Sequence, residues 1–214
     1  MQKNIIGVIV LTLLSTGLFA QSGIETDYWF TAGVSKKLNK RVKLFIEPEL
    51  RFSNTFELNE LIIEAGSDFK IHKFFTLAAA YRYADEYKSL GTYHYNQFGI
   101  DAKPSFKPLK MFEIAARIRY SNFSDYGILY DNSFAFRYKI GADYEIKPIK
   151  TTLSVDAEWF QTPDFSEFKK VRYSFGTAVD VHKNIALIVA YKYEHFLLKD
   201  KNEGILNFGV KVKL

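Results

Sequence analysis

The segment FAFRYKIGADY, residues 134–144, decides the fold class. Every second residue in it is apolar or aromatic, beginning with Phe134 and ending with Tyr144. Arg137, Lys139 and Asp143 occupy positions between them. Successive side chains of a β-strand point to opposite faces, so this period of two predicts a strand with one apolar face and one charged face.

The same alternation extends along the chain in both directions. It predicts strands near residues 28–37, 42–52, 61–71, 112–120, 153–159, 171–181, 185–193 and 206–214, with less regular ones near 74–84 and 92–106. Eleven consecutive strands predict an all-β fold, namely an antiparallel up-and-down transmembrane β-barrel. Single-chain bacterial barrels usually have an even number of strands, so we expect 10–12. Either residues 21–27 add a short strand or cross the lumen, or residues 28–37 form a plug and ten strands close.

The connections between these strands alternate in length. We expect tight turns near residues 38–41, 72–73, 107–110, 145–150 and 182–184, and longer loops near 53–59, 85–91, 122–131, 161–169 and 197–203. Outer-membrane barrels have short periplasmic turns and longer external loops. A glycine recurs on the charged face shortly before each tight turn or the end of the chain: Gly33, Gly66, Gly99, Gly141, Gly176 and Gly209. Glycine inside a strand is typical of bends or crowded sites, and a narrow barrel interior is both.

The first twenty residues have the composition of a secretory signal peptide. Lys3 precedes an apolar run at residues 5–14, and small residues lead to Ala20. We therefore expect a signal peptide at residues 1–20, cleavage after Ala20, and a single outer-membrane β-barrel domain at residues 21–214. The apolar run is shorter than the roughly 20 residues that span a bilayer as a helix. No Cys follows it, which excludes lipoprotein anchoring.

Alternation alone does not say whether the apolar face points into a core or outward into lipid. A soluble periplasmic lipid-binding barrel would enclose that face, whereas a membrane barrel would expose it. The aromatic residues favour a membrane barrel, because they gather at both ends of the apolar face, as in the interfacial girdles of membrane barrels. They are Tyr81, Tyr83, Tyr120, Trp159, Tyr173, Tyr191 and Tyr193 toward the long loops, and Phe69, Phe75, Phe106, Phe112 and Tyr144 toward the short turns. The final strand also alternates to Leu214, an ending that the barrel-assembly machinery reads. We expect the Gram-negative outer membrane as location, with its lipid and lipopolysaccharide as partners.

Composition excludes several other classes of function. The chain has no Cys, which excludes disulfides, thiolate metal sites and Cys nucleophiles. Its net charge of +5 comes from Lys and Arg spread along the chain, so a nucleic-acid partner is not expected. No His cluster with metal-ligand spacing and no phosphate-binding glycine loop is present, so we expect no metal and no cofactor. Asp164, Glu167 and the loop with Asp125 and Asp131 could contact a divalent ion or lipopolysaccharide, but solvated loops are the preferred interpretation.

Two histidines could carry chemistry at the outer rim. Some small barrels use His with Ser, Asp or Glu to cleave or transfer acyl groups. His94 and His195 lie near long-loop ends, with Asp85, Glu86, Ser89, Glu194 and Asp200 nearby in sequence. A lipid-modifying hydrolase or acyltransferase is therefore an alternative, although interfacial side chains explain both histidines more simply. His72 and His182 are expected to be solvated turn residues. We assign no catalytic residue.

The charged face carries acids and arginines in similar number. The acids are Glu47, Glu49, Glu64, Glu113, Asp156 and Glu158, and the arginines are Arg51, Arg82, Arg117, Arg119, Arg137 and Arg172. Acid–base pairs are conceivable, but a charge buried without a partner is costly, so ion pairing across the lumen is the simpler hypothesis.

The start of the mature chain resembles a known family. Trp29, then Glu47, Glu49, Leu50, Arg51 and Phe52, are similar to an uncharacterised family of outer-membrane barrels, the domain of unknown function 2490, common in Bacteroidota. Pro48 departs from a regular strand. The resemblance implies the fold and the location and no site. The sequence thus predicts a structural, interaction or narrow-channel barrel with a charge-paired, largely filled lumen, since barrels of this size fill their interior with side chains.

Overall fold

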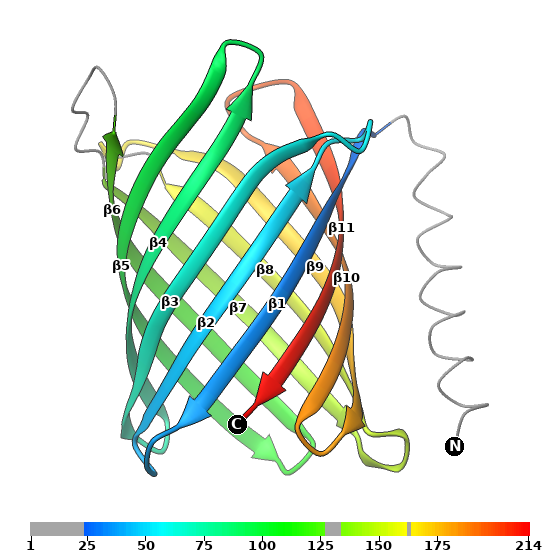
Figure 1. Cartoon of the computed structure of the whole chain (residues 1–214). Helices are drawn as coiled ribbons and strands as arrows, with labels where there is room; N and C mark the ends of the chain where they lie inside the picture. Colours follow the sequence, from blue (N-terminus) through cyan, green and yellow to red (C-terminus); the bar gives the residue numbers. More distant parts are fainter. Residues whose placement is uncertain (1–23, 127–133, 162–163) are drawn as a thin grey trace.

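The computed structural model describes residues 24–126, 134–161 and 164–214. They form eleven strands that close into one barrel (Figure 1). The strands are β1 (Thr26–Lys37), β2 (Val42–Phe52), β3 (Leu58–His72), β4 (Phe75–Lys88), β5 (Gly91–Leu109), β6 (Phe112–Tyr126), β7 (Phe134–Ile146), β8 (Thr151–Gln161), β9 (Phe168–His182), β10 (Ile185–Phe196) and β11 (Lys201–Lys213). The predicted all-β up-and-down barrel is confirmed. The predicted signal peptide and its cleavage after Ala20 lie outside the described residues.

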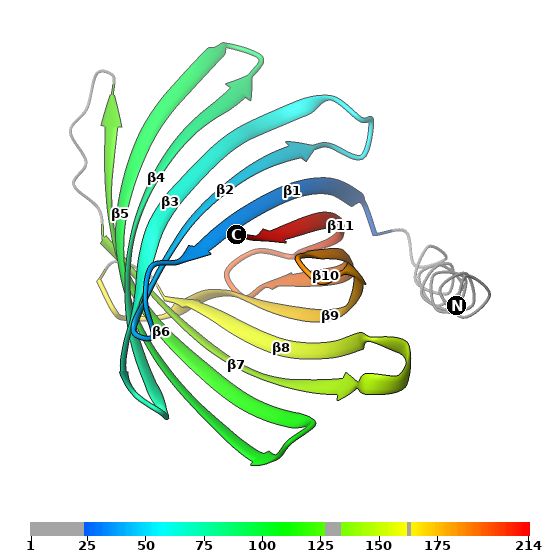
Figure 2. The same cartoon turned by 60° about the horizontal axis from the view of Figure 1, so that its bottom comes forward.

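Ring closure determines the one unusual strand pair. Each strand pairs antiparallel with its neighbours in sequence, and the ring closes between β1 and β11, which run parallel. An odd number of up-and-down strands leaves the first and last strands pointing the same way, so their seam must be parallel. Figure 2 shows β11 between β1 and β10. The seam extends from Thr26 opposite Gly204 to Ser35 opposite Lys213. Residues 28–37 therefore belong to a barrel strand, and the alternative that they form a plug is wrong.

Turn lengths agree with the prediction at one end of the barrel and differ at the other. The short connections are at residues 38–41, 73–74, 110–111, 147–150 and 183–184, the fourth containing the 3-10 helix η2 (Lys147–Ile149). We call this the short-turn end and the opposite one the loop end. The long loop predicted at 85–91 is wrong, because pairing continues to Lys88 opposite Gly91. Tyr and Thr residues there favour strand, and Gly91 adopts a φ of 134° that closes the turn. The predicted loop at 197–203 shrinks likewise to residues 197–200.

Pro48 does not interrupt its strand. It pairs with Ile63 in the middle of β2, and the register is continuous from Val42 to Arg51.

Among the described residues, no helix has the length and apolar composition needed to span a membrane.

Gly66 has a clear packing reason. A Cβ at this position would lie 2.4 Å from the carbonyl oxygen of Ala79 and 2.7 Å from Cζ of Phe45. Phe45 projects from β2, so its ring lies over the space that a side chain at Gly66 would need. The interior is therefore crowded at this glycine, as the sequence suggested.

We expect Gly66→Ala to destabilise the barrel, because backbone and an aromatic ring both contact the added methyl group. Overpacking of this kind costs about 1–3 kcal/mol. Urea unfolding of the purified protein, monitored by tryptophan fluorescence, measures it. Gly99→Ala is the matched control, since its Cβ would have no heavy atom closer than 3.5 Å. Equal midpoints for the two variants would contradict the steric explanation.

Candidate functional site in the barrel lumen

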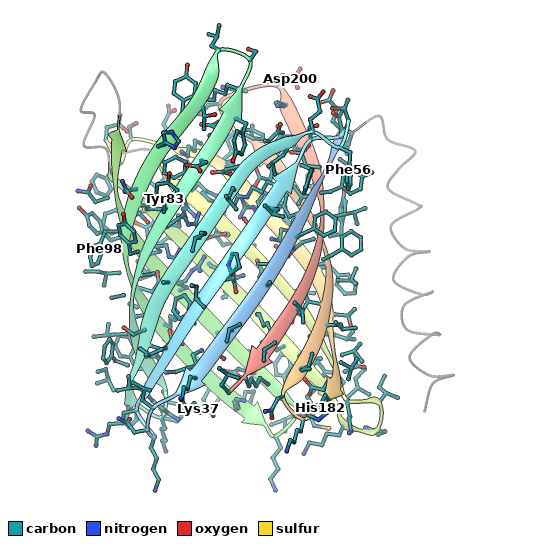
Figure 3. All side chains as sticks on the ribbon, in the orientation of Figure 1. Lys37, Phe56, Tyr83, Phe98, His182 and Asp200 are labelled. Carbon is teal, nitrogen blue, oxygen red and sulfur yellow. The ribbon has the colours of Figure 1, made fainter. Side chains whose placement is uncertain are left out.

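The two faces of the sheet are chemically opposite. Large apolar side chains are exposed on the outer surface of each strand from β2 to β10, including Ile100 at 47% exposure, Val155 at 50% and Tyr173 at 51%. In Figure 3, Phe98 and Tyr83 lie on this outer surface. The alternate residues of the same strands face the lumen and carry most of the ion pairs. The predicted division into an apolar face and a charged face is confirmed, and the charged face is the inner one.

Trp29 is surrounded by cations inside the lumen, toward the loop end. The guanidinium of Arg51 lies 3.9 Å from the centroid of its ring, the ammonium of Lys192 4.4 Å and the guanidinium of Arg172 5.1 Å. Trp29 itself is only 6% exposed. Cations over a desolvated aromatic face are attracted by its quadrupole. One ring on β1 thus gathers cations from β2, β9 and β10.

Phe160 on β8 is a second platform of this kind. Lys170 and Arg172 each lie 4.8 Å from its ring centroid, and Arg137 lies 5.0 Å from it. Glu194 connects two of these cations, because it accepts hydrogen bonds from Lys170 and from Arg172. We call Trp29, Phe160 and the cations around them the aromatic layer.

Ion pairs continue through the middle of the lumen. Arg119 donates to Asp101 at 2.6 Å and also to Glu64 at 3.2 Å. Glu64 accepts in addition from Arg82 at 2.6 Å. Asp101 is 2% exposed, so its charge depends on these donors rather than on water.

Further ion pairs join side chains on β6, β7 and β8. Arg117 on β6 pairs with Glu158 on β8 at 2.5 Å, and Lys139 pairs with Asp156 at 2.8 Å. The predicted charge pairing is thereby confirmed for most of the named residues. Arg137 and Glu47 are exceptions: neither forms an ion pair within the described part of the chain.

The half of the lumen toward the short-turn end is hollow. One cavity of about 730 Å³ extends from the middle of the barrel, where Glu64 and Arg119 line it, to Lys183 and Leu214 at the short-turn end. A second of about 430 Å³ adjoins it and shares Asp68, Lys103 and Arg117 with it. We call the two together the vestibule. The vestibule therefore lies between the aromatic layer and the short-turn end.

One comparison with known proteins finds a family. The sequence model described as "Protein of unknown function (DUF2490)" matches residues 26–204. The chain belongs to this family. The match begins at the first residue of β1 and ends inside β11, so DUF2490 coincides with the barrel. No curated protein and no solved structure matches the chain.

Outside the DUF2490 lumen, the structure brings together part of one predicted rim site. His94 Nδ1 lies 2.6 Å from Oδ1 of Asp85 and 3.2 Å from the hydroxyl of Tyr83. His195 Nδ1 lies 2.7 Å from Oδ1 of Asn202. Both histidines are on the outer face, away from the lumen.

These contacts lack the geometry of a catalytic triad. Within the described residues, no Ser or Thr hydroxyl hydrogen-bonds to His94 or His195. Glu86 pairs with Lys88, and Glu194 faces the lumen in its pairs with Lys170 and Arg172, so neither orients a histidine. The rim residues accordingly form hydrogen-bonded pairs without a nucleophile.

The remaining polar candidates behave as turn and loop residues. The ring nitrogens of His72 and His182 accept hydrogen bonds from backbone N–H groups two residues on, at 3.4 Å. Asp164 accepts from the backbone N–H and the hydroxyl of Ser166. The described residues contain no group of three His, Cys, Asp or Glu suited to a metal ion. Asp131 lies outside the described residues.

Sequence reasoning missed the aromatic layer. It placed the aromatic residues on the outer face, whereas Trp29 and Phe160 face the lumen. Adjacent aromatic residues, as in Tyr28-Trp29-Phe30 and Trp159-Phe160, carry the relevant information. Neighbours along a strand point to opposite faces, so one member of each run has to point inward.

Arg119 and Asp101 provide a test of the ion-pair network. Arg119→Met leaves the buried Asp101 without its strongest donor, and breaking a buried pair in this way costs about 3–5 kcal/mol. The double variant Arg119→Met/Asp101→Leu removes both charges and should recover most of that loss. Urea midpoints of the wild type, the single variants and the double variant give the coupling energy. Additive losses would show that the two side chains do not depend on each other.

Proposed function

We propose that the protein is an outer-membrane barrel with a structural or interaction role, whose lumen is closed to diffusion at the aromatic layer. The observation that carries this proposal is the apolar outer surface over nine consecutive strands around an ion-paired interior. Soluble proteins rarely expose a continuous apolar surface of this extent, whereas hydrocarbon contact stabilises it.

Strand length and aromatic placement support the same proposal. The shortest strands have 11 residues, and about 9–11 tilted residues are enough to cross a bilayer. Aromatic rings cluster on the outer face near the loop end. The rings of Phe52 and Phe56 are stacked 4.9 Å apart, and Phe30 stacks against Phe208. This cluster extends the predicted girdle at the long loops across the seam. Figure 3 shows Phe56 at the loop end of the barrel and Lys37 at the short-turn end.

The alternatives from the sequence have less support. A soluble lipid-binding barrel needs an apolar interior, but the described lumen carries ion pairs and an aromatic layer covered by cations. A rim hydrolase needs a nucleophile beside His94 or His195, and the described contacts supply none. In the proposed location, acyl chains contact the outer strands, the interfacial rings lie at the level of the lipid headgroups, including lipopolysaccharide, and the barrel-assembly machinery inserts the chain.

The two tryptophans test the direction of the faces directly. The chain has only Trp29, in the lumen, and Trp159, on the outer face. We expect lipids brominated on their acyl chains to quench the fluorescence of Trp159 strongly and that of Trp29 weakly. Single-tryptophan variants, Trp29→Phe and Trp159→Phe, reconstituted in such lipids measure each residue separately. Equal quenching of both, or a barrel that stays soluble without detergent and is not quenched, would contradict the proposal.

Closure at the aromatic layer is tested by conductance. We expect the wild-type barrel to show no steady current steps in planar bilayers at neutral pH, because the rings and their cations fill the cross-section. Trp29→Ala/Phe160→Ala removes both platforms and should produce measurable steps, if gel migration of unheated samples shows that the variant is folded. Val155→Ala on the outer face is the control and should remain silent. Steady conductance of the wild type would refute the closed lumen.

A further inference from the structure

The wall of the vestibule formed by β1, β11 and the turn between β9 and β10 carries a surplus of cations. Eight cationic and three acidic side chains line the 730 Å³ cavity. The acids Glu64 and Asp68 are already engaged: Glu64 pairs with Arg82 and Arg119, and Asp68 with Lys43 and Lys103. Arg117 and Arg119 also have carboxylate partners, so four of the eight cations remain without an ion pair among the described residues.

Four lysines hold this surplus. They are Lys37, Lys183, Lys211 and Lys213, and none forms an ion pair with a described residue. Lys37 comes from β1, Lys211 and Lys213 come from β11, and Lys183 lies in the turn between β9 and β10. Because β1 and β11 are hydrogen-bonded at the seam, three of these ammonium groups come from neighbouring strands.

Arg117 adds an observation from deeper in the vestibule. It lines both cavities, and its guanidinium pairs with Glu158 through one terminal nitrogen. Its Nε is buried and finds no acceptor among the described residues. A buried donor without an acceptor is costly, and an anion bound in the vestibule would supply one.

We propose that the vestibule binds a small phosphate-bearing anion, which enters from the short-turn end. Four ammonium groups that have no ion-pair partner among the described residues suit the two or more negative charges and the several acceptor oxygens of a phosphate compound. The volume falls within the range of sites for small molecules. The site requires only the closed barrel, so it holds whether or not the barrel lies in the outer membrane.

Free phosphate compounds and phospholipid headgroups share this chemistry. The described wall of the vestibule is a continuous hydrogen-bonded sheet, since β1 pairs with both β2 and β11. A lipid in a surrounding bilayer could therefore reach the site only by turning its headgroup around the short-turn rim. This geometry favours a soluble phosphate compound.

Titration of the full-length protein in detergent with pyrophosphate tests the site. At low ionic strength, where screening is weak, isothermal calorimetry should show one saturable site. Lys211→Gln/Lys213→Gln should weaken binding at least tenfold. Glu47→Gln removes an unpaired acid from the same cavity and should tighten binding severalfold. Gel migration and circular dichroism confirm that each variant is folded.

The matched control is Lys36→Gln/Lys110→Gln. Both lysines lie at the short-turn end and lose the same charge, but neither lines the vestibule. This variant should bind within twofold of the wild type. Absence of saturable binding to the wild type, or equal weakening in the control, would overturn the proposal.

Short-chain lipids separate the two sources of phosphate. Dihexanoyl phosphatidylglycerol, used as a monomer with dihexanoyl phosphatidylcholine as control, is added before the pyrophosphate titration. If the site serves soluble compounds, neither lipid should change the affinity for pyrophosphate. Competition by the anionic lipid alone would support the site and assign it to a headgroup. Equal competition by both lipids would contradict selection by charge.

Discussion

Closure of a narrow cylinder is the constraint on which the rest of the structure depends. Arg119 and Glu64 are 55 residues apart and come from β6 and β3, yet they are joined at 3.2 Å because the sheet curves back on itself. In an open sheet the same side chains would lie on one face, three strands apart, and would be hydrated separately. Inside the ring, a buried carboxylate such as Asp101 is shielded from water and needs a cation from a neighbouring or facing strand. The ion-pair network is thus a consequence of curvature as much as of sequence.

Closure in turn depends on the seam. Eleven strands require that β1 and β11 meet in parallel, and their ten register pairs make the ring continuous. Asn207 strengthens this contact with a side-chain hydrogen bond to the carbonyl oxygen of Trp29 and another to the hydroxyl of Thr31. The same residue, Trp29, holds the cations of the aromatic layer. Trp29 therefore belongs both to the seam and to the aromatic layer.

The sequence predicts the parts of this structure that depend on local periodicity. The alternation in residues 134–144 gives the strand, its apolar face and its charged face, and the repetition of that pattern gives the barrel. Contacts that depend on three-dimensional closure are harder to predict. The residues near Tyr28 do not indicate whether β1 closes the ring or forms a plug. The general rule of an even strand number allows the plug, whereas the structure closes with eleven strands. The strand around Tyr87 and Thr92 was mistaken for a loop because its polar residues follow no clear alternation.

The candidate site shows the same limit. The charged residues of the lumen were predicted as a set, since their face follows from period two, but their partners were not. Asp68 of β3 pairs with Lys43 of the neighbouring strand β2 and with Lys103 of β5, which lies beyond β4. These partners depend on side-chain length and on the register of four strands. Trp159 and Phe160 are consecutive in β8, so one of them points inward, but the aromatic character of both does not indicate which one.

The glycine repeat and the aromatic layer together explain the position of the vestibule in the half of the lumen toward the short-turn end. Gly33 lines the larger cavity and Gly141 the smaller one, each in a strand that runs toward the short-turn end. Small residues there leave volume that the inward aromatic residues occupy at the loop end. Cations near the loop end contact aromatic rings or pair with carboxylates, whereas Lys37, Lys183, Lys211 and Lys213 of the vestibule form neither kind of contact with a described residue. An anion entering from the short-turn end would therefore meet the four lysines first, then the ion pairs around Arg119 and then the aromatic layer.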